Sequence, residues 1–238
     1  MLQKTNAIVI NSIKYADNSL ITTCYTEEYG IKAYLLRGIL SSKKGKIKKA
    51  LFQPLTQLQI VANHNNKGHL NNIKEAQITQ YYQSLQTDIV KQSITLFLSE
   101  ILYSCLREEE ANQSLYKYIE TALIWLDTHD KVSNFHLLFL LNLTKYLGFY
   151  PENNNSHAYF DLVEGKFMAK PVSNLYITNP QINYLKSLLG TNFDALPSIV
   201  FNASQRQEVL ELLIQYISLH LQAFKKPKSL VILHSLFK

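Results

Sequence analysis

The sequence has few of the residues that build disulfide frameworks or zinc sites. It contains two cysteines in 238 residues, Cys24 and Cys105, which lie far apart among apolar or β-branched neighbours. Because a disulfide framework or a zinc module needs more cysteines at closer spacing, we expect two reduced thiols in a core. The seven histidines form no close ligand pair with a cysteine or with one another at helical spacing. We therefore predict no metal site and no cofactor.

Hydrophobic runs long enough to cross a membrane are also missing. The segment Met1–Asn6 is polar, and the longer apolar stretch at 135–143 is interrupted by His136 and Asn142. A bilayer span needs about 20 apolar residues, and a secretion signal needs a charged start followed by an apolar run. The sequence thus predicts a cytoplasmic protein without a membrane contact. Its 47% hydrophobic and 18% charged residues predict that it folds.

Signatures of catalysis are absent as well. The seven glycines are scattered and form no phosphate-binding loop, and there is no Gly-x-Ser-x-Gly sequence. The acidic run Glu108–Glu110 makes a poor carboxylate site, because three consecutive helical residues point in different directions. We predict that the protein is not an enzyme and has no catalytic residue and no small-molecule substrate. A small hydrolase or transferase is the least favoured alternative.

Positive charge is concentrated at the start of the chain. Residues 1–60 contain nine lysines and arginines against three acidic residues, which gives this segment a net charge of +6. The whole chain also has a net charge of +6, so the remainder is neutral. This segregation is typical of a polyanion-binding domain attached to a neutral domain.

The first eighty residues show short strand patterns separated by turns. A first candidate covers 8–13, β-branched residues are dense in 20–25, and apolar and polar residues alternate in 31–36. Two later strand candidates cover 55–62 and 70–78. Five short strands fit a small closed barrel. The OB type is the economical choice, because closure removes exposed strand edges and leaves a face for oligonucleotides.

From about Ser84 the apolar period becomes helical. A first helix carries its apolar stripe from Val90 to Cys105, Asn112 can cap a second, and a third covers 133–147 and is apolar nearly all round. After Pro197 a long helix begins, with Ser204 and Gln207 at capping-box spacing.

An irregular insertion at about 152–179 interrupts the helices and contains a predicted hairpin around Glu164-Gly165. We therefore predict an α+β fold. An N-terminal OB-type β-barrel that binds DNA occupies 1–80, and an all-α domain with a small β-hairpin insertion occupies 81–238.

A lysine-rich loop follows the third predicted strand, directly after Arg37-Gly38. Lysine ammonium groups on such a loop can hold phosphates without reading the base sequence. The predicted contacts are Arg37, Lys43, Lys44, Lys46, Lys48 and Lys49. Tyr15, Tyr25 and Tyr34 fall in the barrel segment, where an exposed ring could stack on an unpaired base. Tyr25 and Tyr34 are the predicted stacking residues, although packing in the core is the ordinary role of a strand tyrosine. An RNA-binding OB-fold module acting in RNA processing or translation stays open as the alternative.

Several segments, in this order, resemble the RecO family of bacterial recombination mediators. They are Ser19–Gly30, Leu36-Arg37-Gly38 with the lysines after it, Leu51–Leu55, the helix segment Phe97–Leu106, and Leu147–Pro151. Many members of that family carry four cysteines as a zinc module after the last of these segments. This chain has no cysteine there, so it is similar to the zinc-free form, whose hairpin must be stabilised by packing of Tyr159, Phe160 and Phe167.

The resemblance implies a DNA repair and homologous recombination function. A family member binds single- and double-stranded DNA, anneals complementary strands and works with RecR. It also binds the C-terminal tail of single-stranded DNA-binding protein and helps to load RecA onto DNA coated by that protein. The resemblance further implies a nucleoid-associated location in the bacterial cytoplasm.

Overall fold

The computed structural model describes residues 2–41, 47–64, 70–107, 110–152 and 157–237. Contacts divide the chain into two compact units, Met1–Asp127 and Thr128–Lys238. The predicted domain boundary near residue 80 coincides with the change from strands to helices. The first two helices nevertheless have their contacts with the strands of the first unit, so the boundary between independent domains stays a prediction.

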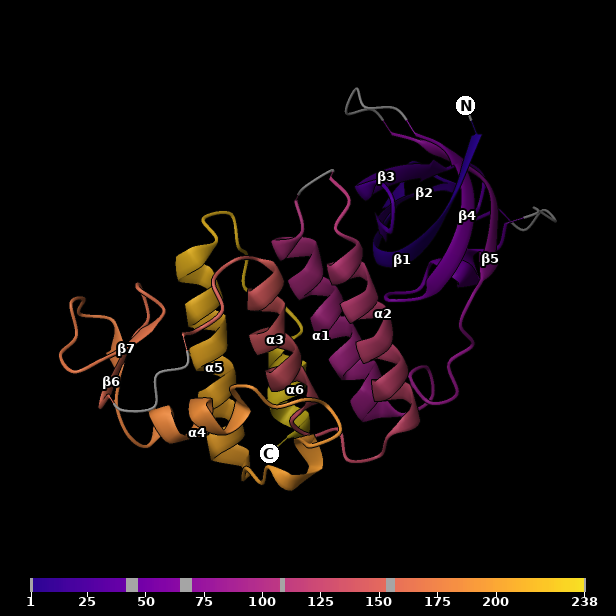
Figure 1. Cartoon of the computed structure of the whole chain (residues 1–238). Coiled ribbons are helices and arrows are strands. Elements are labelled where there is room, and N and C mark those ends of the chain that lie inside the picture. The colour runs from indigo at the N-terminus through magenta and orange to yellow at the C-terminus, as the bar shows by residue number, and fades with distance from the viewer. Residues whose placement is uncertain (1, 42–46, 65–69, 108–109, 153–156, 238) are drawn as a thin grey trace. The chain divides into compact units, whose positions relative to one another are not determined.

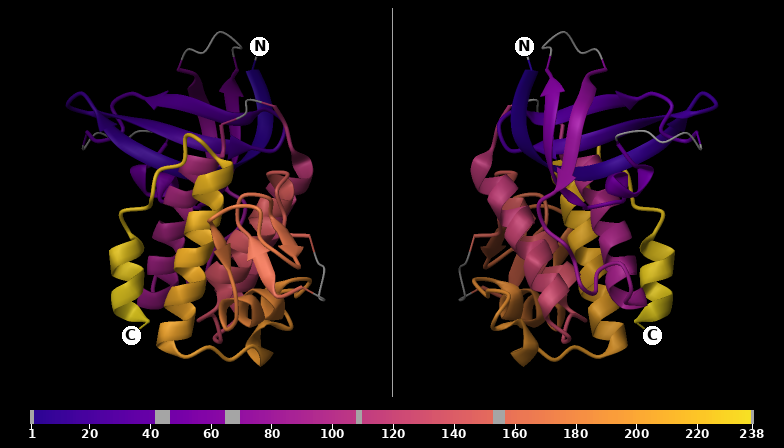
Figure 2. Two further views of the ribbon diagram at one scale, coloured as in Figure 1. Left: turned by 90° about the vertical axis from the view of Figure 1, so that its left-hand side faces the viewer. Right: turned by 90° about the vertical axis from the view of Figure 1, so that its right-hand side faces the viewer.

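The first unit contains a five-stranded antiparallel sheet in the order β3-β2-β1-β4-β5. Its strands are β1 (Leu2–Tyr15), β2 (Ser19–Thr26), β3 (Gly30–Leu36), β4 (Gln57–Asn63) and β5 (Asn72–Ile78). The outer strands meet at a parallel bridge between Tyr34 and Asn71, where the Leu35 amide donates to the Asn71 carbonyl over 2.9 Å. This contact closes the sheet into a barrel, and Figure 2 shows its strands curving across one another. The predicted OB-type barrel is confirmed.

Side chains alternate between the inside and the outside of the barrel, as the pleat of a strand requires. The inner cluster includes Ala7 and Val9 of β1, Leu20 and Cys24 of β2, and residues of each other strand. A bulge between Val9 and Asn11 lets β1 run as one long strand from Leu2, earlier than the polar start of the sequence suggests.

Two helices complete the first unit, α1 (Ile89–Cys105) and α2 (Gln113–Thr128). They run side by side in Figure 1. The predicted cap of the second helix is confirmed, because the Asn112 side chain accepts a hydrogen bond of 2.9 Å from the Leu115 amide. α1 contacts β1, and the Gln57 side chain of β4 donates to the Glu120 carbonyl of α2.

The second unit contains four helices and a small sheet in its described part. The helices are α3 (Phe135–Tyr146), α4 (Gln181–Leu188), α5 (Ala203–His220) and α6 (Leu230–Leu236). The strands are β6 (Tyr159–Asp161), β7 (Lys166–Met168) and β8 (Tyr176–Ile177), in the order β7-β6-β8. The predicted hairpin is confirmed as β6 and β7. Strand β8 and helix α4 were not predicted, because two or eight residues give too short a periodic pattern.

The predicted capping box of the long helix is wrong. Asn202 is the cap, since its backbone is extended and its side chain accepts from the Gln205 amide while the Gln205 side chain accepts from the Asn202 amide. Ser204 already lies in the first turn of α5. Asn202 and Gln205 have the same spacing as the predicted pair Ser204 and Gln207, so spacing alone does not identify the cap.

Candidate nucleic-acid interface

The described ends of the basic loop lie on the surface of the barrel. Arg37 follows β3 and is exposed, and Lys48 and Lys49 are exposed at the start of a short 3-10 helix, Lys49–Phe52. Residues 42–46 lie outside the described residues, so the positions of Lys43, Lys44 and Lys46 stay predictions. Three of the six predicted cations are therefore available to solvent in the described part of the loop.

Both described ends of this loop are fixed to the barrel. On the first side, the Leu40 amide donates to the Asn18 carbonyl in the β1–β2 turn over 3.1 Å. On the second side, Phe52 is buried in the barrel core, and the Ser12 hydroxyl donates to its carbonyl over 3.0 Å. The partly buried side chains of Ile39, Leu40, Ile47 and Leu51 also pack against this core. The two described ends of the loop therefore have fixed places on the barrel.

The two tyrosines predicted to stack on bases are buried, so that prediction is wrong. Tyr25 is 3% exposed, lies against the ring of Tyr116 and donates its hydroxyl to the Asn112 carbonyl. Tyr34 is fully buried inside the barrel, with its hydroxyl 2.7 Å from Nε2 of His64. Burial raises the pKa of the Tyr34 hydroxyl, which stays protonated. Neither ring has a face open to a base.

One of the nine N-terminal cations is not available to phosphates. Lys32 is 5% exposed, because the alternation of β3 turns it inward together with Tyr34 and Leu36. Burial, and then the positive charge of Lys32, lower the pKa of the nearby His64. The alternating pattern of β3 was the signal that could have identified Lys32 as an inward-facing residue.

The hairpin of the second unit has a buried carboxylate where zinc-containing relatives would need cysteines. Asp161 accepts five hydrogen bonds, from the amides of Val163, Glu164, Val172 and Ser173 and from the Ser173 hydroxyl, over 2.8–3.2 Å. Phe160 and Phe167 are buried with their ring centroids 4.8 Å apart. Segment 152–179 contains no cysteine, and the Asp161 oxygens are already occupied, so its residues do not fit a zinc ion.

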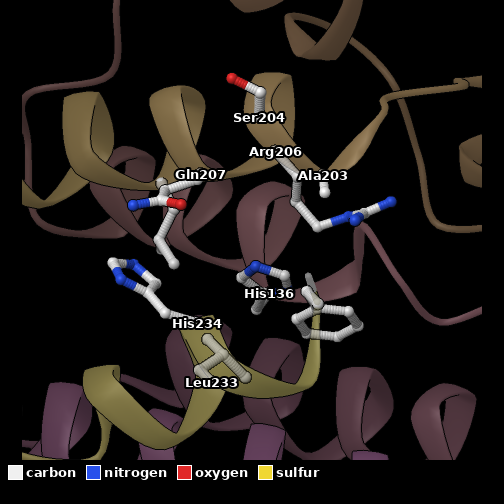
Figure 3. A pocket seen from close by; sticks show the side chains of 9 residues that line it. His136, Ala203, Ser204, Arg206, Gln207, Leu233 and His234 are labelled. Carbon is white, nitrogen blue, oxygen red and sulfur yellow. The ribbon is translucent and has the colours of Figure 1, made fainter.

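A pocket of about 240 Å³ lies between α3, α5 and α6 in the second unit. Figure 3 shows Arg206 and Gln207 of α5 on one side, Leu233 and His234 of α6 on the other, and His136 of α3 between them. Burial lowers the pKa of His136 to about 3, with contributions from Arg206 and His234, so the His136 ring is neutral at physiological pH. The Arg206 guanidinium is therefore the cation of this pocket.

Comparisons with known proteins match both parts of the chain to one family. Residues 1–82 match the model described as recombination protein O N terminal, and residues 86–230 match recombination protein O C terminal. The chain belongs to the RecO family. Its N-terminal match covers the barrel, and its C-terminal match begins just before α1 and includes the hairpin.

RecO proteins of several bacteria are similar to the chain over nearly its entire length. The DNA repair protein RecO of Christiangramia forsetii is 45% identical over 238 residues and covers 100% of both chains. That of Flavobacterium psychrophilum is 46% identical over 236 residues, 98% of each chain, and that of Bacteroides fragilis is 37% identical over 243 residues. The chain is a DNA repair and recombination protein of this family. No helix in its described part is both long and apolar enough to cross a membrane.

Proposed function

We propose that this RecO protein binds single- and double-stranded DNA through the basic loop of its barrel, anneals complementary strands and, with RecR, helps to load RecA. The observation that carries the proposal is the exposure of Arg37, Lys48 and Lys49 on a loop whose two described ends are fastened to the barrel. Fixed cations of one sign displace the condensed counterions of a nucleic acid, and they do so without reading its sequence. A mediator that must act on any broken DNA needs this kind of contact.

Salt dependence tests the proposal. If five or six phosphates are neutralised, the affinity for a single strand falls with a log–log salt slope of about −4. Two triple variants divide the cations of the loop. The first replaces Lys43, Lys44 and Lys46 with alanine, and the second replaces Arg37, Lys48 and Lys49 with alanine. Each is expected to flatten the slope by about 2, because each phosphate contact contributes about 0.7 on a single strand. The measurement is a titration of a fluorescent oligonucleotide over a salt series.

A matched control removes three exposed lysines from the second unit, Lys225, Lys226 and Lys228→Ala. This control has the same change of net charge, so it is expected to keep the slope of the wild type. If the loop variants also keep that slope, the loop does not touch DNA. Competition between matched RNA and DNA strands tests the alternative of an RNA-binding module, which predicts preferential binding of RNA.

We further propose that the pocket of the second unit receives the acidic, apolar C-terminal tail of single-stranded DNA-binding protein. Its Arg206 guanidinium suits a carboxylate, and Leu210, Leu233 and Phe237 suit an apolar side chain. His234 also lines this pocket. Holding DNA and the coat protein at once would let the mediator displace the coat.

Replacing Arg206 with glutamine is expected to weaken binding of a fluorescent tail peptide about tenfold or more, because it removes the cation that the peptide carboxylates pair with. The control is Lys145→Gln, which removes an exposed cation of α3 and should leave binding unchanged. Arg206 also donates to Asn134 and to the Phe201 carbonyl, so thermal unfolding of each variant is measured alongside. If the Arg206→Gln variant is folded and binds the peptide as tightly as the wild type, the tail does not bind in this pocket.

A further inference from the structure

The outer face of β1, β2 and β3 carries a row of apolar side chains. In the sheet register, Ile13 lies opposite Ile21, Ile21 lies opposite Leu35, and Tyr15 lies opposite Ser19. Leu20 and Leu36 point into the core, so alternation places Ile13, Tyr15, Ile21 and Leu35 together on the outside. We name these four residues the outer tyrosine patch.

The patch is accessible to solvent. Ile13 and Tyr15 are each 50% exposed, and Ile21 and Leu35 are partly exposed. Within the described residues, the Tyr15 ring packs against no other aromatic ring and its hydroxyl makes no hydrogen bond. A contiguous apolar surface with an open aromatic ring is typical of a binding site rather than of a solvated strand.

The surroundings of the patch are basic. Arg37 is exposed two residues after Leu35, and the loop after Arg37 is hydrogen-bonded to the β1–β2 turn at Asn18. Lys14 is exposed as well, but its register with Leu20 and Leu36 turns its side chain to the opposite face of the sheet. Asp17 in that turn is the one acidic residue of the hairpin tip. An aromatic ring beside positive charge suits a single-stranded nucleic acid, which presents both unpaired bases and phosphates. A protein partner would need acidic side chains to match this charge.

We propose that Tyr15 is a stacking platform for an unpaired base of a strand whose phosphates lie at Arg37. The inference rests on the proposed function and adds a basis for distinguishing single strands from duplex. Every base has a flat π face, so stacking on a tyrosine does not depend on sequence. In a duplex the bases are stacked on one another, and Tyr15 reaches only the backbone.

The test compares three ligands of equal length: a thymidine strand, the same strand with abasic sites, and a duplex. Tyr15→Ala is expected to weaken binding of the thymidine strand about tenfold, within a range of about 5- to 100-fold. Binding of the abasic strand and of the duplex should stay unchanged, as should the salt slope. Tyr15→Phe should keep wild-type affinity, because the ring alone is needed. Tyr15→Leu should lose as much affinity for the thymidine strand as Tyr15→Ala does, although leucine keeps an apolar side chain at this position of β1.

Tyr103→Ala is the matched control, since Tyr103 of α1 is also 50% exposed and lies on no strand. It should bind all three ligands like the wild type. If Tyr15→Ala loses as much affinity for the abasic strand or for the duplex as for the thymidine strand, the stacking role is overturned. If Tyr15→Leu binds the thymidine strand with wild-type affinity and a wild-type salt slope, the inference is overturned and the proposed function is left intact. A wild-type protein that binds none of the three ligands overturns both.

Discussion

Replacing Asp161 with alanine is expected to unfold the small sheet of the second unit locally, at a loss of about 3 to 5 kcal/mol. The carboxylate accepts four main-chain hydrogen bonds from two separate segments, at Val163-Glu164 and at Val172-Ser173. Without it, these amides lose their acceptor, and a buried donor left unsatisfied costs about 1–3 kcal/mol. Amide hydrogen exchange at the four residues is the measurement, and their protection should fall together. Glu164→Ala is the control, because Glu164 is exposed in the same turn.

The effect should depend on pH in a defined direction. Burial alone would raise the pKa of Asp161, but the hydrogen bonds from Ser173, Glu164 and Val163 outweigh it and lower the pKa. A carboxyl whose pKa is lower in the folded state contributes stability that is complete above its unfolded pKa of about 3.9 and is lost as the pH falls through the folded pKa. Asp161→Asn should remove this acid-dependent part. Unchanged exchange protection in Asp161→Ala would show that aromatic packing alone stabilises the hairpin.

Replacing Asp127 with alanine is expected to lower the free energy of unfolding of the first unit by about 3 to 5 kcal/mol. Asp127 lies in the last turn of α2 and is 4% exposed. Its carboxylate accepts from the amides of Gln83, Ser84 and Leu85 over 2.8–3.0 Å, and so fastens the segment before α1. The buried amide of Leu85 and the partly buried amides of Gln83 and Ser84, left without an acceptor, account for a loss of this size.

A buried cation enlarges the effect of Asp127. Lys91 of α1 is 4% exposed, and its ammonium donates to the Ser84 hydroxyl and to the Asp127 carbonyl. Asp127→Ala keeps that carbonyl but removes the carboxylate that also accepts from the Ser84 hydroxyl, so one partner of the buried ammonium is held less firmly. Urea unfolding followed by the fluorescence of Trp125, the one tryptophan, reports on α2 directly. Asp130→Ala, an exposed aspartate three residues later, is the control and should unfold like the wild type. A midpoint of Asp127→Ala equal to the wild type would contradict the assignment.

Local patterns were enough to predict most of the elements. Alternation in 31–36 and β-branched residues in 20–25 correspond to β3 and β2, and the helical stripe from Val90 to Cys105 corresponds to α1. The cap at Asn112 was predicted because it depends on residues adjacent in the sequence. Errors arose where two local signals were equivalent, as at Asn202 and Ser204, or where an element was as short as β8.

The candidate site was predicted only in part, because burial is a property of the tertiary structure. Tyr25 and Ile21 lie on the same outer face of β2, yet Tyr25 is covered by Asn112 and Tyr116 while Ile21 remains partly exposed. No periodicity within β2 shows that α2 covers one end of that face. Tyr34 differs again, since its place in the alternation turns it inward.

Composition and short-range spacing were enough to predict the barrel strands, the longer helices, the positive charge of the first sixty residues and the lack of cysteines around the hairpin. The tertiary structure decided that Tyr15 is open while Tyr25 and Tyr34 are buried, and that Asp161 and Asp127 join segments up to 44 residues apart. The physical reason is that a side chain's exposure and its hydrogen-bond partners depend on chain segments that meet only after folding.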